Sequence, residues 1–243
     1  MSRRWLIARL GALTSLLALG QATSAFAGSA GGKVSRLVSS IDELSAALRG
    51  DLISVADWRV GIARLLAQVS EHDLMAGIDF ETLSARISFA KLGVSTANID
   101  FGLQGPKQLG FIPKLFAVDV GRSIIPHGHA NMVSAHLPLS GAFRLRQYDQ
   151  VSRDENALYI RPTEDRLIGP GDVSSIGEDD DNVHWFIAEK PSYTFDVIVT
   201  GLDDGADQIF DVFNLDIEAA EPGSDGLLRA PRMTVEEALK KYG

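Results

Sequence analysis

Three of the five histidines in this 243-residue chain stand where β-structure would let them share one metal ion. His127 and His129 are two residues apart, so both imidazoles leave the same face of an extended segment. His184 lies in the run from Asn182 to Phe186, which predicts a strand carrying a third ligand. The chain has no cysteine, so any metal must be held by His, Asp or Glu. Three neutral imidazoles leave coordination positions open for dioxygen and substrate.

Asp196 is the candidate catalytic residue, because it stands inside the apolar run 193–199. A carboxylate is costly to bury without a partner, which favours a functional position facing an interior cavity. The alternative is an edge strand with Asp196 in water. His136 lies an odd number of residues beyond His129. An unbroken strand therefore points it to the other face, as a surface histidine or one behind the ligands rather than a ligand.

Glycines frame the first histidine pair at a recognisable spacing. Five residues separate Gly121 from His127, and Gly141 stands twelve after His129. This pattern resembles the first cupin motif, G-x5-H-x-H-x4-E-x6-G, except that Ser134 stands where the motif carries its glutamate ligand. The resemblance implies a cupin barrel whose metal site lacks the usual fourth protein ligand.

An ordered series of short segments resembles one branch of the cupins, the thiol dioxygenases that include cysteamine dioxygenase and the plant cysteine oxidases. It covers about residues 108 to 200, and its matching segments are 125–132, 139–141, 146–149, 170–172, 182–186 and 195–198. The resemblance implies Fe(II) bound by His127, His129 and His184, with Asp196 near the amine of the substrate. The implied substrate is a small thiol or an N-terminal cysteine, which dioxygen oxidises to a sulfinic acid.

Two other functions stay open at this point. The same ligands would serve a metal-binding cupin of another activity, either a different dioxygenase or an isomerase. A barrel could also hold a small ligand without catalysing any reaction. Oxygen uptake on a panel of thiols separates these alternatives.

The wider pattern predicts a mainly β protein: a cupin-type antiparallel β-barrel with an N-terminal helical extension and a short C-terminal helix. Apolar residues recur with a 3.6-residue period from Trp58 to Val69, which indicates a helix, and a second helix is expected from Glu81 to Leu92. A capping box at Thr234 indicates the closing helix. Strands are expected at 115–120, 132–139, 143–148, 157–160, 184–188, 194–200 and 209–217.

The chain divides by composition into five segments. We expect a signal peptide at 1–27, a flexible leader at 28–40, the helical extension at 41–100, the barrel at 101–217 and a C-terminal tail with its helix at 218–243. Residues 1–27 combine an arginine pair, a short apolar stretch and an A-x-A cleavage site. Their start resembles a twin-arginine signal, and a general secretory signal is the alternative. Both place the protein in the bacterial periplasm or outside the cell.

Charge excludes one class of partner. The whole chain carries a formal charge of −9. Residues 1–27 hold three arginines and no acid, so the remainder has 20 bases against 32 acids. With no basic face to displace counterions from phosphates, a nucleic acid partner is not expected.

The apolar stretch in the first 27 residues has about 10 residues where a spanning helix needs about 20, so no stable membrane anchor is expected either.

Overall fold

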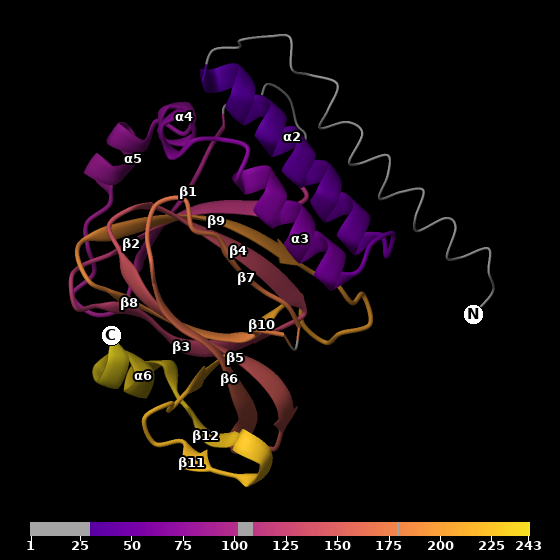
Figure 1. Ribbon diagram of the computed structural model, residues 1–243, viewed down its shortest axis with the longest axis vertical. Coiled ribbons are helices and arrows are strands. Elements are labelled where there is room, and N and C mark those ends of the chain that lie inside the picture. The colour runs from indigo at the N-terminus through magenta and orange to yellow at the C-terminus, as the bar shows by residue number, and fades with distance from the viewer. Residues whose placement is uncertain (1–29, 102–108, 179) are drawn as a thin grey trace, which may run out of the picture.

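Two antiparallel sheets face each other in the computed structural model, which describes residues 30–101, 109–178 and 180–243 (Figure 1). One sheet has five strands in the order β1-β2-β9-β4-β7, and the other has seven in the order β10-β3-β8-β5-β6-β12-β11. The strands are β1 Ser95–Asn98, β2 Ile112–Val118, β3 Ser123–Ala130, β4 Met132–Ser140, β5 Phe143–Arg153, β6 Ala157–Ile168, β7 Ser174–Ile176, β8 Val183–Ala188, β9 Ser192–Thr200, β10 Asp211–Leu215, β11 Glu221–Pro222 and β12 Leu228–Met233.

The eight strands from β2 to β9 form a jelly roll. Four of them pair in the order β2-β9-β4-β7, and the other four pair in the order β3-β8-β5-β6. Two facing four-stranded antiparallel sheets with these strand orders form the type of barrel found in cupins. The predicted mainly β, cupin-type barrel is therefore confirmed by the strand order of the chain itself.

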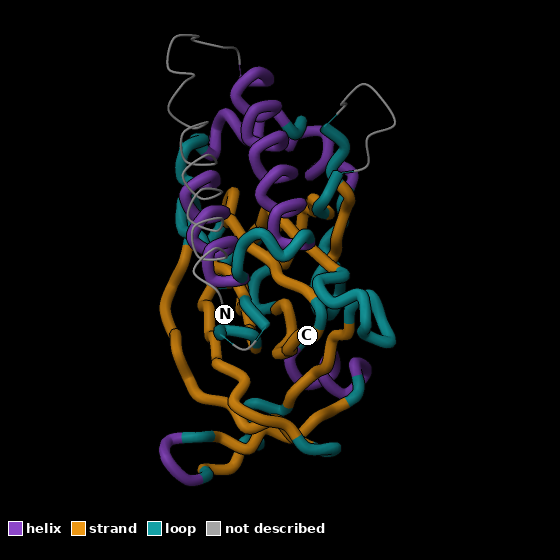
Figure 2. Tube along the Cα trace, turned by 90° about the vertical axis from the view of Figure 1, so that its right-hand side faces the viewer, coloured by secondary structure: helices purple, strands orange, loops and turns teal. Residues whose placement is uncertain are grey.

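Four helices cover the outer face of the five-stranded sheet (Figure 2). They are α2 Ala30–Arg49, α3 Val55–Leu66, α4 Glu71–Gly77 and α5 Phe80–Arg86. The predicted helical face is confirmed, because Trp58, Ile62 and Leu66 are all buried in α3. They pack in one apolar core with strand residues such as Leu137 and Phe195.

The N-terminal boundaries differ from the prediction. The flexible leader expected at 28–40 is wrong for the described residues, because α2 already begins at Ala30. Its residues Val34 and Val38 are buried in the core with the other helices, and this contact stabilises the segment. The helix expected at 81–92 runs from Phe80 to Arg86, and the extension expected to be helical to residue 100 ends in strand β1.

The C-terminal segment joins the barrel instead of trailing from it. Strand β12 pairs with β6 and with β10, so the tail expected at 218–243 extends the seven-stranded sheet. The predicted closing helix is confirmed as α6 Val235–Tyr242, and Thr234 and Glu237 form its capping box. A short 3-10 turn, Ser224–Gly226, precedes β12.

Strand alternation separates the two faces of the five-stranded sheet. Leu115, Phe195 and Leu137 lie in register across β2, β9 and β4 and face the helices. Their neighbours Lys114 and Asp196 are in register with His136, so these three face the interior of the barrel. A separate apolar cluster of buried residues comprises Val118, Ile124, Phe143, Leu145, Ile168, Phe186 and Ala188.

The predicted signal peptide at 1–27 lies outside the described residues. Among the described helices, none is both long enough and apolar enough to span a bilayer.

Candidate metal centre

Three imidazoles meet inside the barrel, and the ring of His184 borders its apolar cluster, with a centroid 5.3 Å from that of Phe186. Nε2 of His184 lies 3.1 Å from Nε2 of His127 and 3.3 Å from Nε2 of His129. One nitrogen from each of the three rings lies within 4.8 Å of the others, and this is the metal-sized histidine cluster of the described residues. His129 and His184 are buried, and His127 is half-buried.

The ligand strands are neighbours in the seven-stranded sheet. His127 pairs directly with His184 across β3 and β8, next to an irregularity in the register between Ile124 and His127. Alternation places His129 on the same face as His127. Between them, Gly128 faces outward, where an added Cβ would lie 2.4 Å from the Phe213 ring and 2.9 Å from Oδ1 of Asn182. Only glycine fits this close approach.

Asn182 connects the two ligand strands and is fully buried. Its Oδ1 accepts a hydrogen bond from the backbone N–H of His129 at 2.9 Å, and its Nδ2 donates to the His129 carbonyl at 3.0 Å. Nδ2 also donates to the Gly177 carbonyl at 3.2 Å. Because Asn182 stands two residues before His184, one side chain sets the spacing between a ligand on β3 and a ligand on β8. The sequence alone assigned no role to Asn182, and its position two residues before His184 was the only signal of one.

Burial keeps the three histidines neutral, which is the form that binds metal. Burial lowers the pKa of His127 to about 4, although its hydrogen bond to the Ile125 carbonyl works in the opposite direction. Burial and the neighbouring histidines hold the pKa of His129 and of His184 well below the usual range. His127 donates from Nδ1 to the Ile125 carbonyl at 2.7 Å, so the lone pair of its Nε2 faces the other two rings.

The donor set fits a divalent transition metal. Bonds of about 2.1 Å from imidazole nitrogen to metal place neighbouring ligand nitrogens about 3.0 to 3.4 Å apart in octahedral or tetrahedral geometry. The two observed separations of 3.1 and 3.3 Å lie in that interval. Imidazole suits iron, zinc, copper and nickel alike, so the ligands define a site without selecting the metal.

A second polar cluster lies beside the triad. His136 is buried on β4, and its ring centroid is 4.9 Å from that of His184. Its Nδ1 donates to Oδ2 of Asp196 at 2.7 Å, and the hydroxyl of Ser134 donates to its Nε2 at 2.9 Å. Asp196 is 0% exposed, and its Oδ1 has no hydrogen-bond partner in the part of the chain that the structure describes. This cluster therefore leaves one buried carboxylate oxygen available in the interior.

The structure brings the predicted site residues together but changes two readings. The water-exposed alternative for Asp196 is wrong, because β9 is flanked by β2 and β4 and the side chain is buried. The surface position considered for His136 is also wrong, because its side chain lies behind His184. A turn with Asn131 in the left-handed region separates β3 from β4, so the spacing between His129 and His136 does not determine which face His136 takes. Metal binding by the triad and catalysis by Asp196 stay predictions.

No protein-family model matches the sequence, and no curated protein matches it. Similar solved structures include a cupin superfamily protein from Desulfitobacterium hafniense, with 14% identity over 48% of this chain and 86% of that one, at a TM-score of 0.32. KdgF from Halomonas sp. has 17% identity over 47% and 86% of the two chains, at 0.33. A salicylate 1,2-dioxygenase variant from Pseudoaminobacter salicylatoxidans, bound to gentisate, has 8% identity over 58% and 34%, at 0.37.

Proposed function

We propose that this protein is a non-haem iron dioxygenase that oxidises a small thiol, or a thiol at the N-terminus of a peptide, to a sulfinic acid. The observation that carries the proposal is the convergence of Nε2 of His127, His129 and His184 inside the barrel. The ordered segments that resemble thiol dioxygenases supply the reaction class.

The chain contributes three neutral ligands and no carboxylate to the proposed centre. Ser134, at the position of the usual cupin glutamate, is hydrogen-bonded to His136. Fe(II), when bound, would supply Lewis acidity and the capacity to bind both a thiolate and dioxygen. Because imidazoles add no charge, the ion would keep its full positive charge to hold the thiolate.

Asp196 supports a substrate that carries an amine. Its Oδ1 is buried and has no hydrogen-bond partner among the described residues, and its Oδ2 is bonded to His136, whose ring centroid lies 4.9 Å from that of His184. A charged ammonium donating to that oxygen would supply a hydrogen-bond partner to the one carboxylate oxygen that His136 does not bind. The same contact would fix the amine end of an aminothiol while its sulfur reaches the metal.

The proposed reaction balances without another reductant. A thiol RSH and one O₂ give one sulfinic acid RSO₂H. The sulfur loses four electrons, dioxygen is reduced by the same four, and both of its oxygen atoms end on sulfur. The thiol proton leaves on binding and one proton returns with the product.

The test measures oxygen consumption by the iron-loaded protein with cysteamine, cysteine and a peptide that begins with cysteine. We expect uptake of one O₂ per thiol, a product 32 mass units heavier, and no uptake by His127→Ala. Bound metal without uptake on any thiol would favour another metal-dependent cupin reaction. Ligand binding that is unchanged in His127→Ala would favour a non-catalytic binding protein.

We also propose that the protein is exported to the bacterial periplasm or secreted, on the basis of residues 1–27. Mass spectrometry of the protein recovered from its native compartment tests this. A mature N-terminus near Gly28 supports export, and an intact N-terminus on cytoplasmic protein contradicts it.

A further inference from the structure

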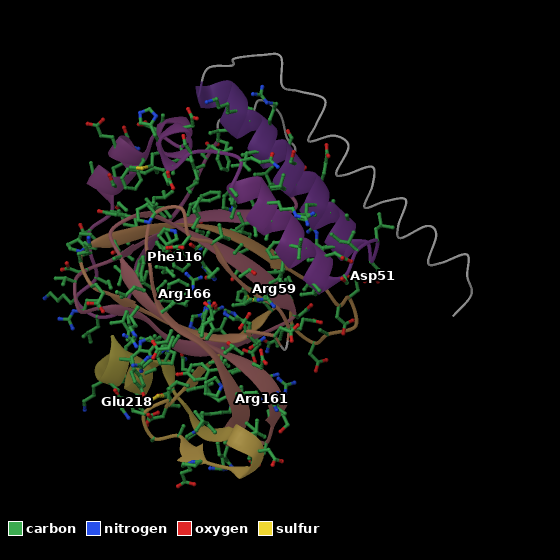
Figure 3. All side chains as sticks on the ribbon, in the orientation of Figure 1. Asp51, Arg59, Phe116, Arg161, Arg166 and Glu218 are labelled. Carbon is green, nitrogen blue, oxygen red and sulfur yellow. The ribbon has the colours of Figure 1, made fainter. Side chains whose placement is uncertain are left out.

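We infer that Arg59, in the helical extension, is a positioning residue of the metal centre. The inference rests on the proposed metal site but not on its reaction. Helix α3 packs against β4 and β7, and Arg59 extends from it toward the barrel (Figure 3). The observations that carry the inference are the three hydrogen bonds of its guanidinium and the contacts that continue from them to two of the ligands.

Arg59 connects segments that belong to different sheets. Its Nε donates to Oγ of Ser175 at 3.0 Å, and its Nη2 donates to the Ser175 carbonyl at 3.0 Å. Nη2 also forms an ion pair with Oδ2 of Asp181. Ser175 lies in β7 of the five-stranded sheet, whereas Asp181 stands two residues before β8 of the seven-stranded sheet. The guanidinium therefore holds together both ends of the connection that carries the chain between sheets.

One route leads from Asp181 to His129. Asp181 adopts the left-handed region, with φ of 52°, and its side chain accepts from Thr163 while its N–H donates to Asp149. These contacts set the direction of the next residue, Asn182, whose amide binds both backbone groups of His129. The Arg59 ion pair is therefore one residue away from the side chain that sets the spacing of the ligand strands.

A second route leads from Ser175 to the neighbour of His184. The Ser175 carbonyl accepts from Arg59 and also from Nε2 of Gln147, at 3.3 Å. Gln147 is buried and pairs with His184 across β5 and β8, so both side chains face the interior. One carbonyl thus connects a helix on the outside of the barrel to a side chain beside a ligand. The helical extension has a role at the metal centre beyond covering a sheet.

Arginine suits this task because its planar guanidinium can bind several acceptors in fixed directions. The Arg59 side chain is only 21% exposed and that of Asp181 22%, so water weakens their ion pair less than it weakens surface pairs. Groups behind metal ligands commonly change metal affinity by about 10 to 100-fold when they are removed. Arg59 lies one hydrogen-bond contact farther from the ligands, so we expect a loss of metal affinity near the lower end of that interval.

The test measures Co²⁺ binding by the full-length, metal-free protein, through chelator competition and the visible spectrum of bound Co²⁺. Arg59→Ala should bind Co²⁺ about tenfold more weakly and shift the spectrum, since the rings no longer hold their spacing. Arg59→Lys keeps the positive charge but loses the planar guanidinium, so its Co²⁺ affinity should lie between those of Arg59→Ala and the wild type. Arg144→Ala is the matched control, because Arg144 also pairs with an aspartate, Asp165, but on the outer side of the barrel.

Wild-type affinity and spectrum in Arg59→Ala would overturn the inference, as would an equal change in Arg144→Ala. Far-ultraviolet circular dichroism checks that each variant folds. If Arg59→Ala does not fold, Arg59→Lys and Asp181→Asn decide the question, and unchanged Co²⁺ binding in both overturns it. His127→Ala separates the two proposals: if it binds Co²⁺ as tightly as the wild type, the metal centre itself is wrong.

Discussion

His136 donates a hydrogen bond from Nδ1 to Oδ2 of Asp196, 2.7 Å away on the neighbouring strand, and both side chains are buried. The hydroxyl of Ser134 occupies the other ring nitrogen of His136. With both nitrogens engaged, His136 has no lone pair left for a metal, although its ring lies against His184. The interior therefore holds two polar groups, the histidine triad and a carboxylate held in place by His136.

Replacing one ligand should abolish tight metal binding. His127→Ala leaves two imidazoles, so we expect at least 100-fold weaker Fe²⁺ or Co²⁺ affinity, measured by chelator competition. The control is His72→Ala, which removes an exposed histidine of α4. Equal metal content in the two variants would show that the triad is not the site.

Asp196→Asn tests the amine contact. The substitution keeps the shape and an acceptor for His136 but removes the charge. A hydrogen bond to a charged group contributes about 1.5 to 3 kcal/mol, so the KM for cysteamine should rise about 10 to 100-fold, with a smaller change in kcat. A thiol that has no amine serves as the internal control, and its kinetics should hardly change. A similar loss on both thiols would assign Asp196 a structural role only.

Gly128→Ala should destabilise the fold at the ligand strand. Its new methyl group would meet the Phe213 ring at 2.4 Å, so β3 and β10 must shift. Overpacking of this kind costs about 1 to 3 kcal/mol, which urea unfolding at neutral pH can measure. Gly31→Ala is the comparison, because nothing lies within 4 Å of its added Cβ and alanine favours the helix. Unchanged stability in Gly128→Ala would contradict the packing described here.

The metal-free protein should lose stability as the pH falls below about 6.5. The pKa of His127 is about 4 in the fold and 6.5 in its ordinary state, so the unfolded chain binds more protons between these values. The free energy of unfolding should therefore be level above pH 6.5 and fall toward pH 4. At about 1.4 kcal/mol per pKa unit, His127 alone accounts for about 3 kcal/mol. Urea unfolding across this interval measures the slope, which should be shallower in His127→Ala.

Local patterns predicted the parts of this protein that depend on nearest neighbours. The two-residue spacing of His127 and His129 places them on one face wherever the backbone is extended, as it is in β3. Thr234 and Glu237 cap α6 because both partners lie within one turn. The apolar period from Trp58 marked the buried side of α3 for the same reason.

Contacts between distant segments decided the rest. The separation of about 55 residues between His129 and His184 is bridged by pairing of β3 with β8 and by Asn182, and neither is visible in the local pattern. The run 28–40 is small and polar enough to resemble a flexible leader, yet α2 forms there because Val34 and Val38 bury against helices and sheet. Residue order defines which face a side chain takes within one element. Burial and hydrogen bonding between elements determine which faces meet, and here they placed the buried carboxylate of Asp196 beside the triad and Arg59 behind it.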